Sequence, residues 1–255
     1  MTNDPSSAPA APAAPRPWGL LGTIAWSAAG VCAWFAAQFA VILAFIAWRN
    51  AVAPGTIDPH KLSSDGFLLA VVVIIAAPAW AAVSVLAARL RGWRARDYLA
   101  LVAPKKGEVL FGIACMAVLL IGFDLLTFAF GRDVVPPFMR DAYTTARDTS
   151  SLPLFFAAVV IVAPITEEIA FRGFLFRGLS ATWFGVGGTL VATSAAWAAM
   201  HVQYDWVNLA QIFLIGLVLG WLRWASGSTL LTIMLHMLAN LGATIEAMIK
   251  VEWMS

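Results

Sequence analysis

Three ionisable side chains, Glu167, Glu168 and Arg172, lie inside an apolar stretch that otherwise has the composition of a membrane-spanning helix. An ionised group near the bilayer centre costs about 2.5 kcal/mol or more, so such groups usually face partners or trapped water. One long side chain can extend to the headgroups, but three in so short a stretch cannot all do so. We therefore expect these residues to line an internal polar cavity.

Helical spacing separates the roles of the three groups. Glu168 and Arg172 are four residues apart, in the order that favours an ion pair along one helix face. Glu167 points about 100° away from Glu168 around the helix axis, so it stays free of that pair. A carboxylate desolvated in a cavity can take a proton from water and later return it, as a general base and acid does.

Three polar residues further along the chain can share this cavity. His236 and Asn240 are four residues apart, and therefore on one helix face, where both can act on the same atom. Their N–H groups suit an oxyanion, and His201 can share or polarise the attacking water. The reaction implied is hydrolysis of an amide bond by water activated within the membrane.

The composition favours a membrane protein over a soluble one. Hydrophobic residues make up 61% of the 255 residues and charged residues 12%, and the mean hydropathy is +0.83. A net charge of +2 does not indicate a nucleic-acid partner. Cys32 and Cys115 lie apart in predicted spans, so we expect neither a disulfide nor a thiolate-zinc site.

We predict an all-α fold, a polytopic transmembrane helix bundle of about seven spans. The Pro/Ala/Ser-rich residues 1–17 are expected to be a disordered tail. Residues 18–130 would hold three spans without motifs, 131–151 an interfacial loop or helix, and 152–250 the catalytic core. The seven apolar runs cover about 18–48, 67–88, 109–130, 152–178, 184–201, 207–224 and 229–249.

The turns between spans bring the polar residues to a similar depth. From the turn near residues 180–183, Glu167 lies about 22 Å and His201 about 28 Å along the helices. The last hairpin turns on the same side, which places His236 about 15 Å and Asn240 about 21 Å deep. Ten of the 16 Lys and Arg residues lie on that side of the membrane, which predicts a cytoplasmic N-terminus.

Two further residue types also carry predictions. Gly216 and Gly220, in a small-xxx-small spacing, predict close helix packing. Four tryptophans are expected to anchor span ends at the membrane interface: Trp48, Trp80, Trp183 and Trp206.

Together the polar residues resemble the motifs of the CPBP intramembrane proteases, which include the type II CAAX prenyl endopeptidases and lysostaphin resistance protein A-like proteins. The family pattern is Glu-Glu-x-x-x-Arg, Phe-x-x-x-His, a Phe/Gly-rich helix, and His-x-x-x-Asn. Here it reads Glu167-Glu168-x-x-x-Arg172, Trp197-x-x-x-His201, Phe213 with Gly216 and Gly220, and His236-x-x-x-Asn240. The resemblance covers residues 150–245 and departs from the pattern at Trp197, where another large aromatic should serve for packing.

The resemblance implies that Glu167 activates water with help from His201, while His236 and Asn240 stabilise the oxyanion. The other charged residues of the first motif would be supporting residues: Glu168 and Arg172. It also implies a multi-pass protein of the bacterial inner membrane, whose partners are the lipid bilayer and a membrane-associated or lipid-modified peptide substrate.

Three alternatives stay open. Two histidines and a glutamate match the ligand count of a catalytic zinc, so zinc is the alternative to a glutamic mechanism without a cofactor. The HExxH spacing is absent and Asn240 is a poor zinc ligand, so we favour the metal-free mechanism. A non-catalytic scaffold or bacteriocin self-immunity protein would keep the same fold. A transporter would use the carboxylates as a proton relay, but the two halves carry no inverted repeat.

Overall fold

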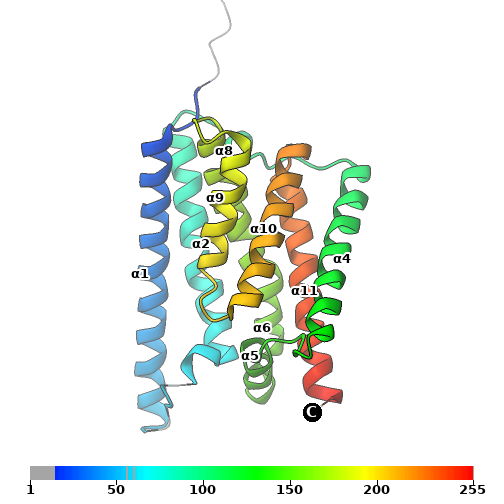
Figure 1. Ribbon diagram of the computed structural model, residues 1–255. Helices are drawn as coiled ribbons and strands as arrows, with labels where there is room; N and C mark the ends of the chain where they lie inside the picture. Colours follow the sequence, from blue (N-terminus) through cyan, green and yellow to red (C-terminus); the bar gives the residue numbers. More distant parts are fainter. Residues whose placement is uncertain (1–14, 56, 60, 255) are drawn as a thin grey trace, which may run out of the picture.

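The computed structural model describes residues 15–55, 57–59 and 61–254, and this part of the chain is helical without a strand. The helices run alternately up and down to form one bundle (Figure 1). Most of the tail expected at 1–17 therefore lies outside the described residues. The predicted all-α class is confirmed.

Six helical segments of the described chain are long and apolar enough to cross a membrane. They are α1 (Leu20–Val52), α2 (Gly66–Leu90), α4 (Lys106–Ala129), the segment Leu152–Ser180, α10 (Trp206–Ser226) and α11 (Thr229–Trp253). Their bounds lie within a few residues of the predicted runs, because an uninterrupted apolar run limits where a span can begin and end.

The remaining expected span, 184–201, is the 15-residue helix α9 (Gly185–Ala199). At about 1.5 Å per residue it is shorter than the hydrocarbon layer, which is about 30 Å thick. The connection to α10 accordingly lies above the lower ends of α1 and α11 in Figure 1. Irregular backbone at membrane depth is tolerated where it lines a polar cavity, so residues 200–205 mark where such a cavity should lie.

The segment Leu152–Ser180 is not a regular α-helix. It consists of α6 (Leu152–Phe156), the π-helical η3 (Ala157–Val162), α7 (Ala163–Glu168), the π-helical η4 (Ile169–Leu175) and α8 (Phe176–Ser180). Wider π turns rotate the following side chains around the axis and are frequent at functional sites. Glu167 and Glu168, at the end of α7, therefore lie between two π-helical segments.

Small residues set the helix contacts. A Cβ atom on Gly216 would lie 2.9 Å from Cβ of Ser194, and one on Gly220 would lie 2.7 Å from Cδ2 of Leu190. The predicted close packing of α10, on α9, is thus confirmed. Gly30 of α1 leaves room for the indole of Trp80, which is 6% exposed. The expectation that Trp80 anchors the interface is wrong, because this helix face turns inward.

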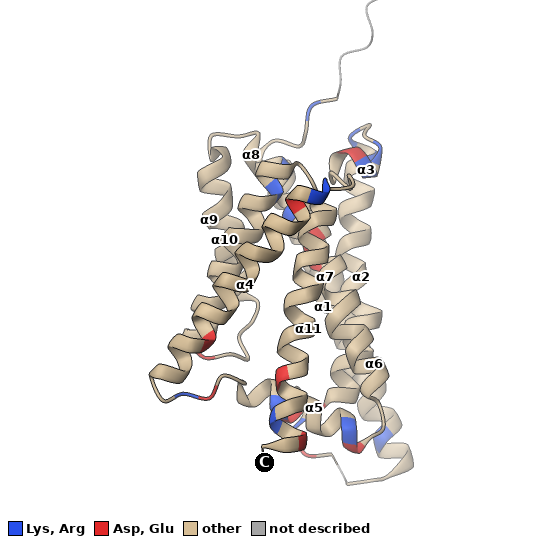
Figure 2. Cartoon of the chain, turned by 90° about the vertical axis from the view of Figure 1, so that its right-hand side faces the viewer, with Lys and Arg blue, Asp and Glu red and all other residues tan. Residues whose placement is uncertain are grey.

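Charges concentrate at the two ends of the bundle (Figure 2). At the upper end lie the short α3 (Ala95–Tyr98) and the basic connection around it. At the lower end α5 (Pro137–Asp148) follows the loop after α4, and η2 (Leu62–Ser64) precedes α2. The buried side of α5 carries Met139 and Tyr143, so the predicted segment 131–151 contains an amphipathic helix.

Candidate active site

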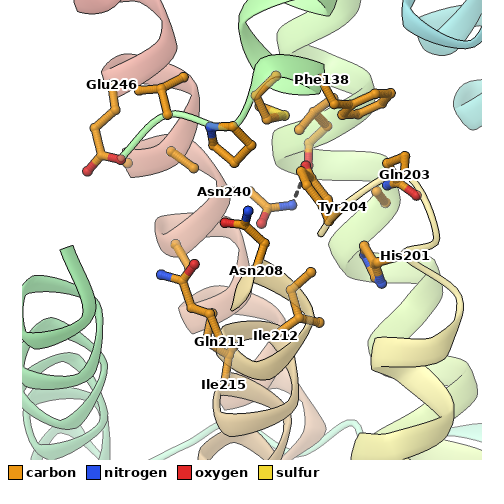
Figure 3. Close-up of a pocket in the computed structure, with 18 of the residues that line it drawn as sticks. Phe138, His201, Gln203, Tyr204, Asn208, Gln211, Ile212, Ile215, Asn240 and Glu246 are labelled. Carbon is orange, nitrogen blue, oxygen red and sulfur yellow. Dashed lines mark hydrogen bonds between the residues drawn. The ribbon is translucent and has the colours of Figure 1, made fainter. Parts of the chain in front are cut away.

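One cavity of about 250 Å³ is lined by all four side chains predicted to do chemistry. Glu167 comes from α7, His201 from the segment after α9, and His236 with Asn240 from α11. Three separate parts of the chain thus bring these groups to one place, as the depth argument predicts. Figure 3 shows His201 and Asn240 projecting into the same pocket.

Glu167 is held on one side only. The indole Nε1–H of Trp197 donates to Oε2 of Glu167 at 2.6 Å. Its other oxygen, Oε1, accepts no hydrogen bond from the described residues, although the side chain lines the cavity. A carboxylate with one oxygen fixed and one open can bind a water molecule in a defined direction.

The tautomer of His201 follows from its backbone contact. Nδ1 lies 2.9 Å from the carbonyl oxygen of Trp197. Because a carbonyl oxygen only accepts, Nδ1 carries the hydrogen and donates it. Nε2 of a neutral ring then keeps a lone pair that can accept from water. The ring of Tyr204, which also lines the cavity, stacks on His201 with centroids 6.2 Å apart.

Glu168 and Arg172 form the predicted ion pair, and both side chains are 0% exposed. Arg172 Nη1 donates to Glu168 Oε1 at 2.9 Å, and Nη2 donates to the carbonyl of Gly216 at 3.3 Å. The same carboxylate oxygen lies 3.0 Å from Nδ1 of His236. The pair therefore joins its own helix to α10 and α11, and it lies behind the cavity rather than in it.

This contact also orients His236. Since Nδ1 faces the Glu168 carboxylate, it carries a hydrogen, and Nε2 is the nitrogen left for the cavity. The imidazolium form would present a second N–H at Nε2.

Asn240 is fixed by a defect in the π-helical segment. The N–H of Ala163 bonds to the carbonyl of Ala158, and Pro164 has no N–H, so the carbonyl of Val159 lacks a helical partner. The amide Nδ2 of Asn240 donates to that carbonyl at 2.9 Å, the dashed line in Figure 3. One N–H and the amide oxygen remain for the cavity. Neither hydropathy nor motif spacing indicated this contact.

The rest of the cavity wall is polar toward the lower end. Side-chain amides of Gln203, Asn208 and Gln211 face the pocket in Figure 3, and Glu246 lies at the end away from His201. Asp124 of α4 lines it as well. Apart from Asp124, which interrupts an apolar run, the sequence carried no signal that singled these residues out.

Asp205 fixes the segment that carries His201. Its carboxylate caps α10 by accepting from the backbone N–H groups of Val207 and Asn208, both at 3.0 Å, and it pairs with Arg132.

A catalytic zinc centre needs about three protein ligands close to one another. In the described part of the chain, no three His, Cys, Asp or Glu side chains gather closely enough to hold one ion. The Nδ1 atoms of both cavity histidines are already engaged by protein oxygens. Only Nε2 of each ring is therefore left as a possible metal ligand, zinc stays the alternative to the metal-free mechanism, and we derive no step through it.

Comparison with known proteins agrees with the motifs. Residues 149–242 match the family model described as type II CAAX prenyl endopeptidase Rce1-like. A curated relative, the "Uncharacterized 24.3 kDa protein" of Escherichia coli, is 33% identical over 131 residues, which are 50% of this chain and 59% of that protein. The chain thus covers less than two thirds of that relative. No solved structure matches the chain.

The matched region begins just before α6 and ends within α11, so it contains every cavity residue predicted to do chemistry. The first three spans lie outside it. The resemblance inferred from the motifs is confirmed over residues 149–242 of this multi-pass membrane protein, which match the model of the type II CAAX prenyl endopeptidase Rce1-like family.

Proposed function

We propose that the chain is an intramembrane endopeptidase that hydrolyses a peptide bond of a membrane-associated or lipid-modified substrate with water activated by Glu167. The observation that carries this proposal is the meeting of Glu167, His201, His236 and Asn240 on one cavity within a helix bundle. A packing role alone would not require four polar side chains to face the same space.

The first step is removal of a proton from water. Oε1 of Glu167 and Nε2 of His201 are the two free acceptors, and a water molecule between them would lose a proton to the carboxylate. The resulting hydroxide attacks the carbonyl carbon, and the carbonyl oxygen becomes an oxyanion.

The second step needs donors at the oxyanion. Nε2–H of protonated His236 and the free N–H of Asn240 come from one face of α11 and act on the same atom. Glu167 then returns its proton to the leaving nitrogen as the C–N bond breaks. The sum is addition of one water across the amide, so the reaction requires no further reactant.

The cavity also supports a peptide substrate. Gln203 and Gln211 offer donors and acceptors that match the backbone of an extended peptide. The apolar side chains of Ile212 and Ile215 line the same space and suit a hydrophobic side chain or lipid group next to the cleaved bond. By the positive-inside rule, the N-terminus and the upper end of the bundle lie on the cytoplasmic side of the membrane, which we propose to be a bacterial inner membrane.

The test is a comparison of peptide ends in membranes that carry the wild type or Glu167→Gln. Proteolysis predicts new termini of membrane peptides that appear only with the wild type. Full biological activity in Glu167→Ala would instead favour a scaffold or immunity protein of the same fold.

A further inference from the structure

We propose that Trp197 is a positioning residue for the attacking water: its indole N–H holds the Glu167 carboxylate in place. This inference rests on the proposed function. A phenylalanine at this position would keep an aromatic ring but would have no hydrogen to donate to Glu167.

Trp197 contacts three of the four cavity residues predicted to do chemistry, and it also contacts Arg172. Its Nε1–H lies 2.6 Å from Glu167 Oε2 and links α9 to α7. The guanidinium of Arg172 lies 4.6 Å from the centre of its ring. The rings of His201 and His236 meet it edge to face, with centroids 5.3 and 5.2 Å away.

These contacts leave the indole little freedom. Trp197 is 3% exposed, and its face and edges are occupied by side chains of three other helical elements or loops. Because the indole is held rigidly, its hydrogen bond to Oε2 fixes the orientation of the Glu167 carboxylate and leaves Oε1 facing the cavity.

The backbone of the same residue orients the second acceptor. The carbonyl of Trp197 receives the hydrogen of His201 Nδ1, while its side chain holds Glu167. Trp197 therefore orients both groups that would bind the attacking water, Glu167 and His201. A small shift of Trp197 would move the two acceptors together and change the approach of water to the carbonyl.

The deciding variant is Trp197→Phe, which keeps an aromatic ring but removes the donor. With a peptide that the wild type cleaves in the comparison of membrane-peptide ends, we expect kcat to fall by about 10- to 100-fold with KM nearly unchanged, because the loss affects water activation rather than substrate contact. Trp80→Phe is the matched control. Trp80 is another buried tryptophan, and its Nε1 has no hydrogen-bond partner within the described chain.

Two results would overturn the inference. Trp197→Phe with a wild-type kcat would show that the donor is dispensable. An equal fall in kcat for Trp197→Phe and Trp80→Phe would show that ring size alone matters.

A second measurement does not depend on activity. The thermal unfolding midpoints of Trp197→Phe, Glu167→Ala and the double variant form a cycle, and a real hydrogen bond makes the two shifts less than additive. Additive shifts in an active enzyme would overturn only this inference. Absence of peptidase activity in the wild type would overturn the proposed function, whatever the cycle gives.

Discussion

Ion pairs occur both in the interior of this bundle and at its lower end. The pairs in these two regions have similar N–O distances but differ in how far their side chains are exposed. Arg172 and Glu168, in the interior, are 2.9 Å apart with both side chains 0% exposed. Lys250 and Asp133, at the lower end, are 2.7 Å apart with side chains 27% and 55% exposed. Water can replace the partner at the lower end but not in the interior. Separation alone therefore says little about how much the protein depends on a pair.

The largest effect is expected from Arg172→Ala. Removing the guanidinium leaves the Glu168 carboxylate buried without its strongest partner, which should destabilise the fold by about 3–5 kcal/mol. Thermal unfolding in detergent, with expression level as a second readout, measures the loss. A near-normal unfolding midpoint would mean that water reaches Glu168, and that the interior pair depends on its partner no more than the pair at the lower end does.

Next comes Glu167→Gln, which keeps the size of the side chain and an oxygen that can still accept from Trp197. Hydrolysis should fall by about 100- to 10,000-fold, because the amide cannot take a proton from water. The unfolding midpoint should stay close to that of the wild type. Metal analysis accompanies this variant: stoichiometric zinc that is lost together with activity would favour the metal mechanism instead.

Asn240→Ala should lose both activity and stability. Removal of an oxyanion donor costs about 100-fold or more in kcat. The unsatisfied carbonyl of Val159 adds about 1–3 kcal/mol of destabilisation. Because Pro164→Ala returns a backbone N–H to this turn, the double variant should recover stability but not activity. A double variant that does not recover stability would contradict the assigned role of the proline.

The smallest effect is expected at the lower end. The hydrogen bond and charge of Lys250 hold the pKa of Asp133 below its ordinary value. A depressed carboxyl pKa adds stability above the unfolded pKa, about 3.9, and this contribution is lost as pH falls through the folded value. Lys250→Ala should therefore lower the unfolding midpoint slightly at pH 7 and by less at pH 3. An exposed pair such as this contributes about 1 kcal/mol or less.

Much of the architecture could be predicted because hydropathy limits where a helix can cross a membrane. The expected run 67–88 is α2, Gly66–Leu90, and the expected run 229–249 is α11, Thr229–Trp253. Helical spacing also predicted the Glu168–Arg172 pair, since residues four apart meet whatever surrounds them.

The details of the site could not be predicted, because they depend on contacts between helices. The position of Trp197 in the motif predicted packing, but only the approach of α9 to α7 makes its N–H a donor to Glu167. Trp80 was placed at the interface by its residue type, and the rotation of α2 buries it. Composition likewise did not reveal that α9 would be short or that two π turns would flank the glutamates.

The missing backbone partner of Val159 has a consequence for biogenesis. While the fourth span is alone in lipid, its proline leaves a bare carbonyl that hydrocarbon cannot solvate. Only arrival of α11, with its asparagine, removes that penalty. A span that is synthesised later thus completes both the reactive centre and the hydrogen bonding of an earlier one, so chains cut short before α11 should retain this penalty.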